Sequence, residues 1–221
     1  VYNVNHMAGF FSVFNPDAVK NVTLYKGSFP ARFGGRLSSV IDVRMNDGND
    51  KEIHGNVSVG IISSKINIEG PIIKEKTTFN ISARRTYSDL LLQPIIMLGM
   101  AQNFQDEEGK LSSGYYFYDL NAKINHKFSN NDRLFFSLYM GDDIIYTNFR
   151  NKQTNIYDEE EQIRYESSNR MNLKWNWGNI VSSIRWNHTI NNKLFMNATA
   201  AYTRYRFNMG VGTTMKNTTT Y

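Results

Sequence analysis

The chain has 221 residues, of which 41% are hydrophobic, with a formal net charge of +5 and no cysteine. The lack of cysteine excludes disulfides, thiolate metal sites and a cysteine nucleophile. No stretch approaches the roughly 20 consecutive apolar residues of a membrane helix, whereas a β-barrel strand needs an apolar residue only at every second position. The basic residues are spread along the chain, so nucleic acid is not an expected partner.

Short elements occupy the chain before Asp47–Asp50, a stretch rich in turn-forming residues. An apolar stretch, His6–Phe14, comes first. Asn15 is a good N-cap and Pro16 suits the first helical position, so a short capped helical turn is expected there. Two alternating stretches, each expected to form a strand, come next: Val22–Lys26 and Leu37–Val43.

From residue 51 onwards the pattern changes to long segments with an apolar residue at every second position. One face of the clearest segment carries Tyr116, Tyr118, Leu120, Ala122 and Ile124. Comparable runs begin near Val57, Ile66, Phe79, Leu134 and Leu194. The sequence therefore predicts an all-β region of about seven antiparallel strands.

The alternation breaks at Gly178-Asn179. The apolar positions are odd-numbered before this point, as at Trp175 and Trp177, and even-numbered after it, as at Ile180 and Ile184. A β-bulge in one long strand or a two-residue hairpin would produce this change. We favour the bulge, because the two turns that flank the region, each followed by a Leu-Phe pair, then lie on the same side of the sheet.

The predicted connections alternate in length. Gly70–Lys76 and Ser129–Asp132 are short, whereas Thr86–Gly114 and Asp142–Ser167 are long and polar. Within the first long connection, Leu90–Met100 forms either a short helix over the barrel mouth or a loop with its own small core. Short turns on one rim and long loops on the other are typical of outer-membrane barrels, as are aromatic residues at the ends of the apolar bands. The alternative is a soluble antiparallel sandwich with aromatic cross-strand pairs.

The first region carries a more specific signal. Asn15–Gly27 is followed by Phe29–Arg36, with the sequence FPARFGGR, and then by Ser38–Val43. This succession resembles the C-terminal part of the plug of TonB-dependent outer-membrane receptors, in the branch whose members often carry a carboxypeptidase-regulatory-like domain. The resemblance implies that residues 1–49 end a small α+β plug domain. It also implies that residues 50–221 form the first strands of a transmembrane β-barrel.

The plug motif itself comprises two arginines and three glycines: Gly27, Arg32, Gly34, Gly35 and Arg36. Glycine allows positive φ and close backbone approach at tight turns. The two arginines flank the turn, where they can pair with carboxylates on the inner barrel wall, with Glu69 and Asp119 as candidates. In the resembled arrangement, the stretch before the capped turn forms an apex facing an external cavity. The candidate substrate contacts there are His6, Phe10, Phe11 and Phe14, with packing inside the plug as the equally open alternative.

The resemblance implies active import across the cell outer membrane, with no covalent chemistry and no cofactor. Substrate would bind between plug and outer loops, and TonB would then pull on a plug segment outside this chain to open a path. Outer-membrane lipid surrounds such a wall, and a surface lipoprotein is an optional further partner. Plugged transporters have about 22 strands, so the chain is expected to be part of a longer protein. The sequence does not identify the substrate.

Two other functions stay open at this point. The first is a soluble or surface β-sandwich that binds a partner or a carbohydrate. The second is an outer-membrane enzyme, although none of the common catalytic motifs is present. The four histidines lack metal-ligand spacing, so no metal site is predicted. The acidic run Asp158–Glu161 fits a solvated loop better than a calcium site.

Overall fold

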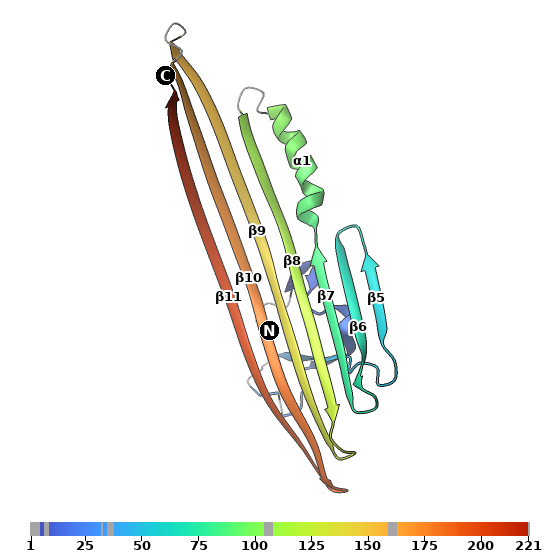
Figure 1. Cartoon of the computed structure of the whole chain (residues 1–221). Coiled ribbons are helices and arrows are strands. Elements are labelled where there is room, and N and C mark those ends of the chain that lie inside the picture. The colour runs from blue at the N-terminus through green and yellow to red at the C-terminus, as the bar shows by residue number, and fades with distance from the viewer. Residues whose placement is uncertain are drawn as a thin grey trace.

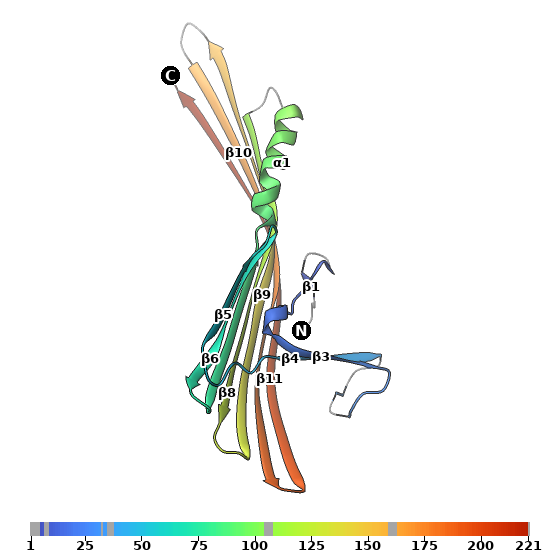
Figure 2. The same cartoon turned by 90° about the vertical axis from the view of Figure 1, so that its right-hand side faces the viewer.

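The computed structural model describes residues 5–6, 9–31, 33–34, 38–103, 108–158 and 163–220. The described residues are mostly β-structure, with 75% of them in strands and 8% in helix, and the sheets are antiparallel. A small N-terminal unit lies against one face of a tall, curved sheet (Figures 1 and 2). This confirms the predicted all-β class.

The N-terminal unit consists of two small sheets joined by a short helical turn. Strands β1 (Asn5–His6) and β2 (Phe11–Ser12) form one pair, and β3 (Val19–Lys26) and β4 (Ser39–Met45) form the other. Between the pairs lies a 3-10 helix, Pro16–Ala18, in which the Asp17 N–H donates to the side chain of the N-cap residue Asn15, as expected for a capped turn. The two predicted strands are confirmed, with boundaries shifted by two or three residues.

The tall sheet has seven strands in the order β11-β10-β9-β8-β7-β6-β5, so each strand pairs with its neighbours in the sequence. This number agrees with the predicted one. In chain order the strands are β5 (His54–Val59), β6 (Ser63–Ile73), β7 (Thr77–Thr86), β8 (Glu108–Lys127), β9 (Asp132–Asp158), β10 (Ile163–Asn191) and β11 (Leu194–Thr220).

The short turns lie together at one end of this sheet. They join β6 to β7, β8 to β9 and β10 to β11, at the bottom of Figure 1. The predicted long loops at the other end are wrong in large part. β8 begins at Glu108, β9 continues to Asp158 and β10 starts at Ile163. Backbone pairing continues there through polar residues, which an alternation of apolar residues does not reveal.

Helix α1 (Ser88–Asn103) takes the place of a strand beside the upper part of β8 (Figure 1). β7 ends at Thr86, and the chain then continues as helix along the exposed edge of β8. Ser88 Oγ donates to the Tyr115 carbonyl at 2.5 Å, and Gln93 Nε2 donates to the Leu111 carbonyl at 3.3 Å. The segment is therefore helical, as in one of the two predicted alternatives, and the helix lies along the edge of β8.

Strand β10 passes Gly178 without interruption, so the predicted bulge and the alternative hairpin are both wrong. The register is continuous on both sides, with Gly178 opposite Asp142 and Arg206 and its neighbours paired in step. A Cβ on Gly178 would lie 1.9 Å from Asp142 Oδ1, so glycine makes room for the Asp142 side chain. The change in parity is thus a real change in which face of the sheet is apolar.

Candidate functional site

The sheet has two chemically different faces, which we call inner and outer. The inner face carries the N-terminal unit, and many of its buried side chains near that unit are polar, beside the buried rings of Phe117, Phe135 and Tyr139. The buried polar side chains include Asn80, Ser82, Asp119, Asn121 and Lys123. The outer face of the same region is apolar and exposed, with Ile81, Ile124, Phe136, Met140 and Ile184 among its residues. A water-soluble protein buries its apolar face instead, so this half of the sheet has the reverse polarity.

Along β10 and β11 the polarity reverses again at one row of the outer face, which we call the crossover row: Tyr118, Asp142, Gly178 and Arg206. On β9, Ile144 and Tyr146 remain on the outer face just above this row. Tyr118 donates its hydroxyl to Asp142 Oδ2 at 2.8 Å, and Arg206 Nε donates to Asp142 Oδ1 at 3.1 Å. The lower half of the sheet lies between this row and the short turns, and the upper half lies beyond it. In the upper half, Trp175 and Met209 are on the inner face.

The N-terminal unit sits on the inner face of the lower half through polar contacts. Asn15 Nδ2 donates to Ser82 Oγ at 2.5 Å, and Lys65 Nζ lies 2.8 Å from Asp17 Oδ2. Gly48, with φ of +84°, passes so close to β7 that a Cβ would lie 2.3 Å from a backbone oxygen. The segment that leads into β5 therefore runs directly over the inner face of β7.

A buried cluster of charged and aromatic groups joins β1 to the inner face of the sheet. His6 Nδ1 lies 2.7 Å from Asp143 Oδ2, and the His6 ring stacks on Phe117 with centroids 4.1 Å apart. Arg84 Nε donates to Asp119 Oδ2 at 2.8 Å. His6 is 2% exposed. Removing one member of such a cluster leaves a buried charge without its partner, which costs about 3–5 kcal/mol.

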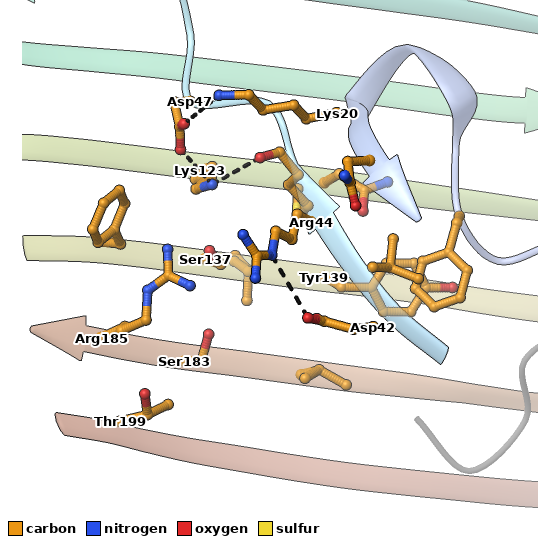
Figure 3. A pocket seen from close by; sticks show the side chains of 18 of the residues that line it. Lys20, Asp42, Arg44, Asp47, Lys123, Ser137, Tyr139, Ser183, Arg185 and Thr199 are labelled. Carbon is orange, nitrogen blue, oxygen red and sulfur yellow. Dashed lines mark hydrogen bonds and ion pairs between the residues drawn. The ribbon is translucent and has the colours of Figure 1, made fainter. Parts of the chain in front are cut away.

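A cavity of about 770 Å³ opens between the β3–β4 hairpin and the inner faces of β8 to β11 (Figure 3). Its charged residues are four cations and two anions: Lys20, Arg44, Lys123, Arg185, Asp42 and Asp47. Uncharged polar residues, such as Ser137, Ser183 and Thr199, line the wall between them. The charged residues among the described lining thus leave an excess of positive charge, and apolar or aromatic residues such as Phe14, Met45 and Phe135 line the remainder.

Asp47 joins the hairpin to the wall at the edge of this cavity. Its carboxylate lies 2.6 Å from Lys123 Nζ and 3.0 Å from Lys20 Nζ. Partial burial alone would raise the pKa of Asp47, but the hydrogen bonds and charges of the two ammonium groups outweigh it and lower the pKa. The carboxylate is therefore ionised at neutral pH and holds two cations.

The residues predicted to form a plug apex do not share one surface. His6 is buried against the wall, whereas Phe10 is 85% exposed. Phe11 lies near the ring of Phe117, at a centroid distance of 5.4 Å, and Phe14 lines the cavity. In this conformation His6 is shielded from solvent, Phe11 and Phe14 are partly exposed, and Phe10 is fully accessible to a solute.

The predicted plug motif is described only in part. Gly27 has φ of +83°, which agrees with the expected role of a glycine at a tight turn. Gly34 has a negative or extended φ and open space around it, so it shows no such need. Arg32, Gly35 and Arg36 lie outside the described residues.

The two predicted partners of these arginines have other contacts. Asp119 pairs with Arg84, and Glu69 accepts a hydrogen bond from Asn80 Nδ2 at 3.1 Å. Sequence reasoning did not identify Arg84 as the partner of Asp119, because the two are opposite each other only once the register is known. The signal that could have found them is a set of charged residues on the polar side of an alternating strand.

The described residues contain no group of three or more His, Asp and Glu side chains that could hold a metal ion. Within the same ranges, no helix is long and apolar enough to cross a membrane. Comparison with known proteins gives no relative, since no family model and no curated protein matches the chain.

Proposed function

We propose that the chain forms part of the wall of a transmembrane β-barrel in the outer membrane. Its N-terminal unit would be the end of a plug, and the complete protein would import a solute in a process driven by TonB. The assignment of the sheet as a membrane wall is based on the polarity of its two faces. The plug and the energy source rest on the sequence resemblance and on the way the N-terminal unit is seated.

The main observation in support of a membrane wall is the length of the apolar outer face. Along β10 its apolar members extend from Ile180, just below the crossover row, to Ile190, just before the turn, with Ser182 and His188 as polar members between them. At about 3.3 Å per residue this is about 33 Å of strand. A tilt of roughly 35–45° reduces it to about 25 Å along the membrane normal, which is the height of the apolar band in outer-membrane barrels.

The residues at the two limits of this band suit a membrane boundary. At the crossover row, Asp142 and Arg206 form a charged pair on the outer face. Near the turns, Trp186 Nε1 donates to Asp132, and His188 lies 2.5 Å from the same carboxylate. Aromatic and charged groups of this kind belong at the interface between hydrocarbon and water. The short turns then face the periplasm, and the upper half with α1 faces outward.

A soluble sandwich fits this arrangement less well. Its sheet would turn the apolar face toward a second layer and the polar face toward water. Here the N-terminal unit covers the polar face, and Ile184 on the opposite face remains 51% exposed. An apolar face of this height is unfavourable in water and favourable in contact with lipid.

The contacts of the N-terminal unit suit a plug that must dissociate from the inner face of the sheet during transport. Hydrogen bonds and ion pairs, such as those of Asn15, Asp17 and Asp47, form a large part of its contacts, beside the ring contact of Phe11 with Phe117. Water can replace polar contacts at a small net cost for each hydrogen bond. An apolar interface would instead expose its surface to water when it opens, at a cost in proportion to its area.

The proposal is tested by fractionating cells that express the native, full-length protein and by running the membrane fraction on gels with and without heating. We expect recovery in the outer membrane and a change of mobility on heating, because folded barrels resist detergent until heated. Recovery as a soluble protein that needs no detergent would refute the wall and favour the sandwich. Loss of function in a strain without TonB then tests the energy source.

A further inference from the structure

Among the described residues that line the cavity beneath the β3–β4 hairpin, one cation has no carboxylate partner. Asp47 pairs with Lys123 and Lys20, and Asp42 lies 3.6 Å from the Arg44 guanidinium. For Arg185, in contrast, no hydrogen bond or ion pair is found within the described part of the chain, and none is drawn to it in Figure 3.

Arg185 is nevertheless held in a defined position. Its guanidinium carbon lies 4.4 Å from the centroid of the Phe135 ring, and Lys123 Nζ lies 5.5 Å from the same centroid. The ring attracts both cations through its negative face. The two positive charges are thereby brought to the same part of the inner wall, although they repel each other.

The surroundings supply further hydrogen-bonding groups. Ser183 lies two residues from Arg185 on the same face of β10, opposite Ser137 of β9. Asn121 is 3% exposed and lines the cavity, and its Nδ2 has no acceptor among the described residues. A volume of about 770 Å³ lies within the range of small-molecule sites, which is roughly 300–1,000 Å³.

We propose that this cavity binds the anionic group of a small polar solute, a carboxylate or a phosphate, with Arg185 as its principal contact. A planar guanidinium offers paired donors that match the two oxygens of either group. Lys123 adds a second positive charge, and the serine hydroxyls can bond to neutral parts of the solute. Equilibrium binding does not require transport, but the role of the site in selecting a cargo rests on the function proposed above.

The test uses the full-length protein in a neutral detergent at constant chloride, with calorimetry as the readout. Glucose 6-phosphate, glucuronate and glucose serve as probes, since they share a sugar ring and differ in charge and in the type of anion. We expect both anionic probes or one of them to bind, which also identifies the anion, and glucose to bind at least about tenfold more weakly. One charge-assisted hydrogen bond corresponds to a factor of about ten or more.

Two variants locate the site. Arg185→Gln should weaken anion binding about tenfold or more, and Ser183→Glu should do the same by placing a carboxylate beside Arg185. Arg170→Gln is the matched control, because Arg170 lies on the same strand with an exposed side chain and its loss changes the net charge equally. Heat-dependent gel mobility confirms that each variant is folded.

Three results would overturn the proposal: no binding of either anion, equal binding of glucose, or equal losses in Arg185→Gln and Arg170→Gln. None of these results affects the membrane wall, which the fractionation tests separately. Conversely, a soluble protein that binds the anions through Arg185 would retain the site and lose the transport function.

Discussion

An arginine at Ile184 gives the most direct test of the proposed lipid-facing surface. Ile184 is on the outer face of β10, four residues from Ile180 and six from Ile190. At about 3.3 Å per residue and a tilt of roughly 40°, these separations become about 10 Å and 15 Å along the membrane normal. The side chain therefore lies near the middle of the apolar band, where an arginine costs about 2–4 kcal/mol.

The free energy of unfolding can be measured for the full-length protein in phospholipid vesicles, from tryptophan fluorescence in a series of denaturant concentrations. Asn172→Arg is the matched control, because Asn172 is on the same strand and the same face, above the crossover row. We expect this control to change the stability by no more than about 0.5 kcal/mol. Equal effects of Ile184→Arg and Asn172→Arg would refute the assignment of the lower outer face to lipid.

Three further changes test other parts of the structure. Gly178→Ala should destabilise the protein by about 1–3 kcal/mol in the same assay through overpacking, whereas Gly212→Ala, with open space around it, should be neutral; equal effects would contradict the crossover row. His6→Ala should increase proteolysis of the N-terminal unit and His54→Ala, which is half-exposed, should not; equal protection would show that the buried cluster does not hold the unit. Because the folded-state pKa of Asp47 is lowered, its contribution is complete above the unfolded pKa of about 3.9 and is lost as pH falls further. Hydrogen exchange of β3 and β4 should rise in that acidic range, and Asp47→Asn should remove the pH dependence.

The lower half of the sheet could be predicted because its two faces differ in polarity. At Leu120, Ala122 and Ile124 the apolar residues alternate with polar ones, and a period of two identifies strands directly. The capped turn at Asn15 and Pro16 was predictable for a local reason, since capping depends on residues that are neighbours in the sequence.

The contacts between distant segments could not be predicted in this way. His6 and Asp143 are 137 positions apart, and Arg84 meets Asp119 only through the register of β7 and β8. Sequence patterns specify which face a residue occupies, but not which residue of another strand lies opposite. The cluster and the cavity are consequences of tertiary pairing and therefore appear only in the structure.

The error at Gly178 has a different cause, and it bears on the proposed function. Interpreting the change of parity as a bulge assumed that one strand keeps one apolar face throughout its length. β10 keeps its register and instead changes its surroundings, with Ile180 apolar on the outer face below the crossover row and Lys174 polar on the outer face above it. A strand that passes through a single environment has no reason to exchange its faces. A strand that leaves a hydrocarbon layer and enters water does, because the outer face must then become polar. The same two residues that misled the sequence interpretation thus support the proposed membrane boundary.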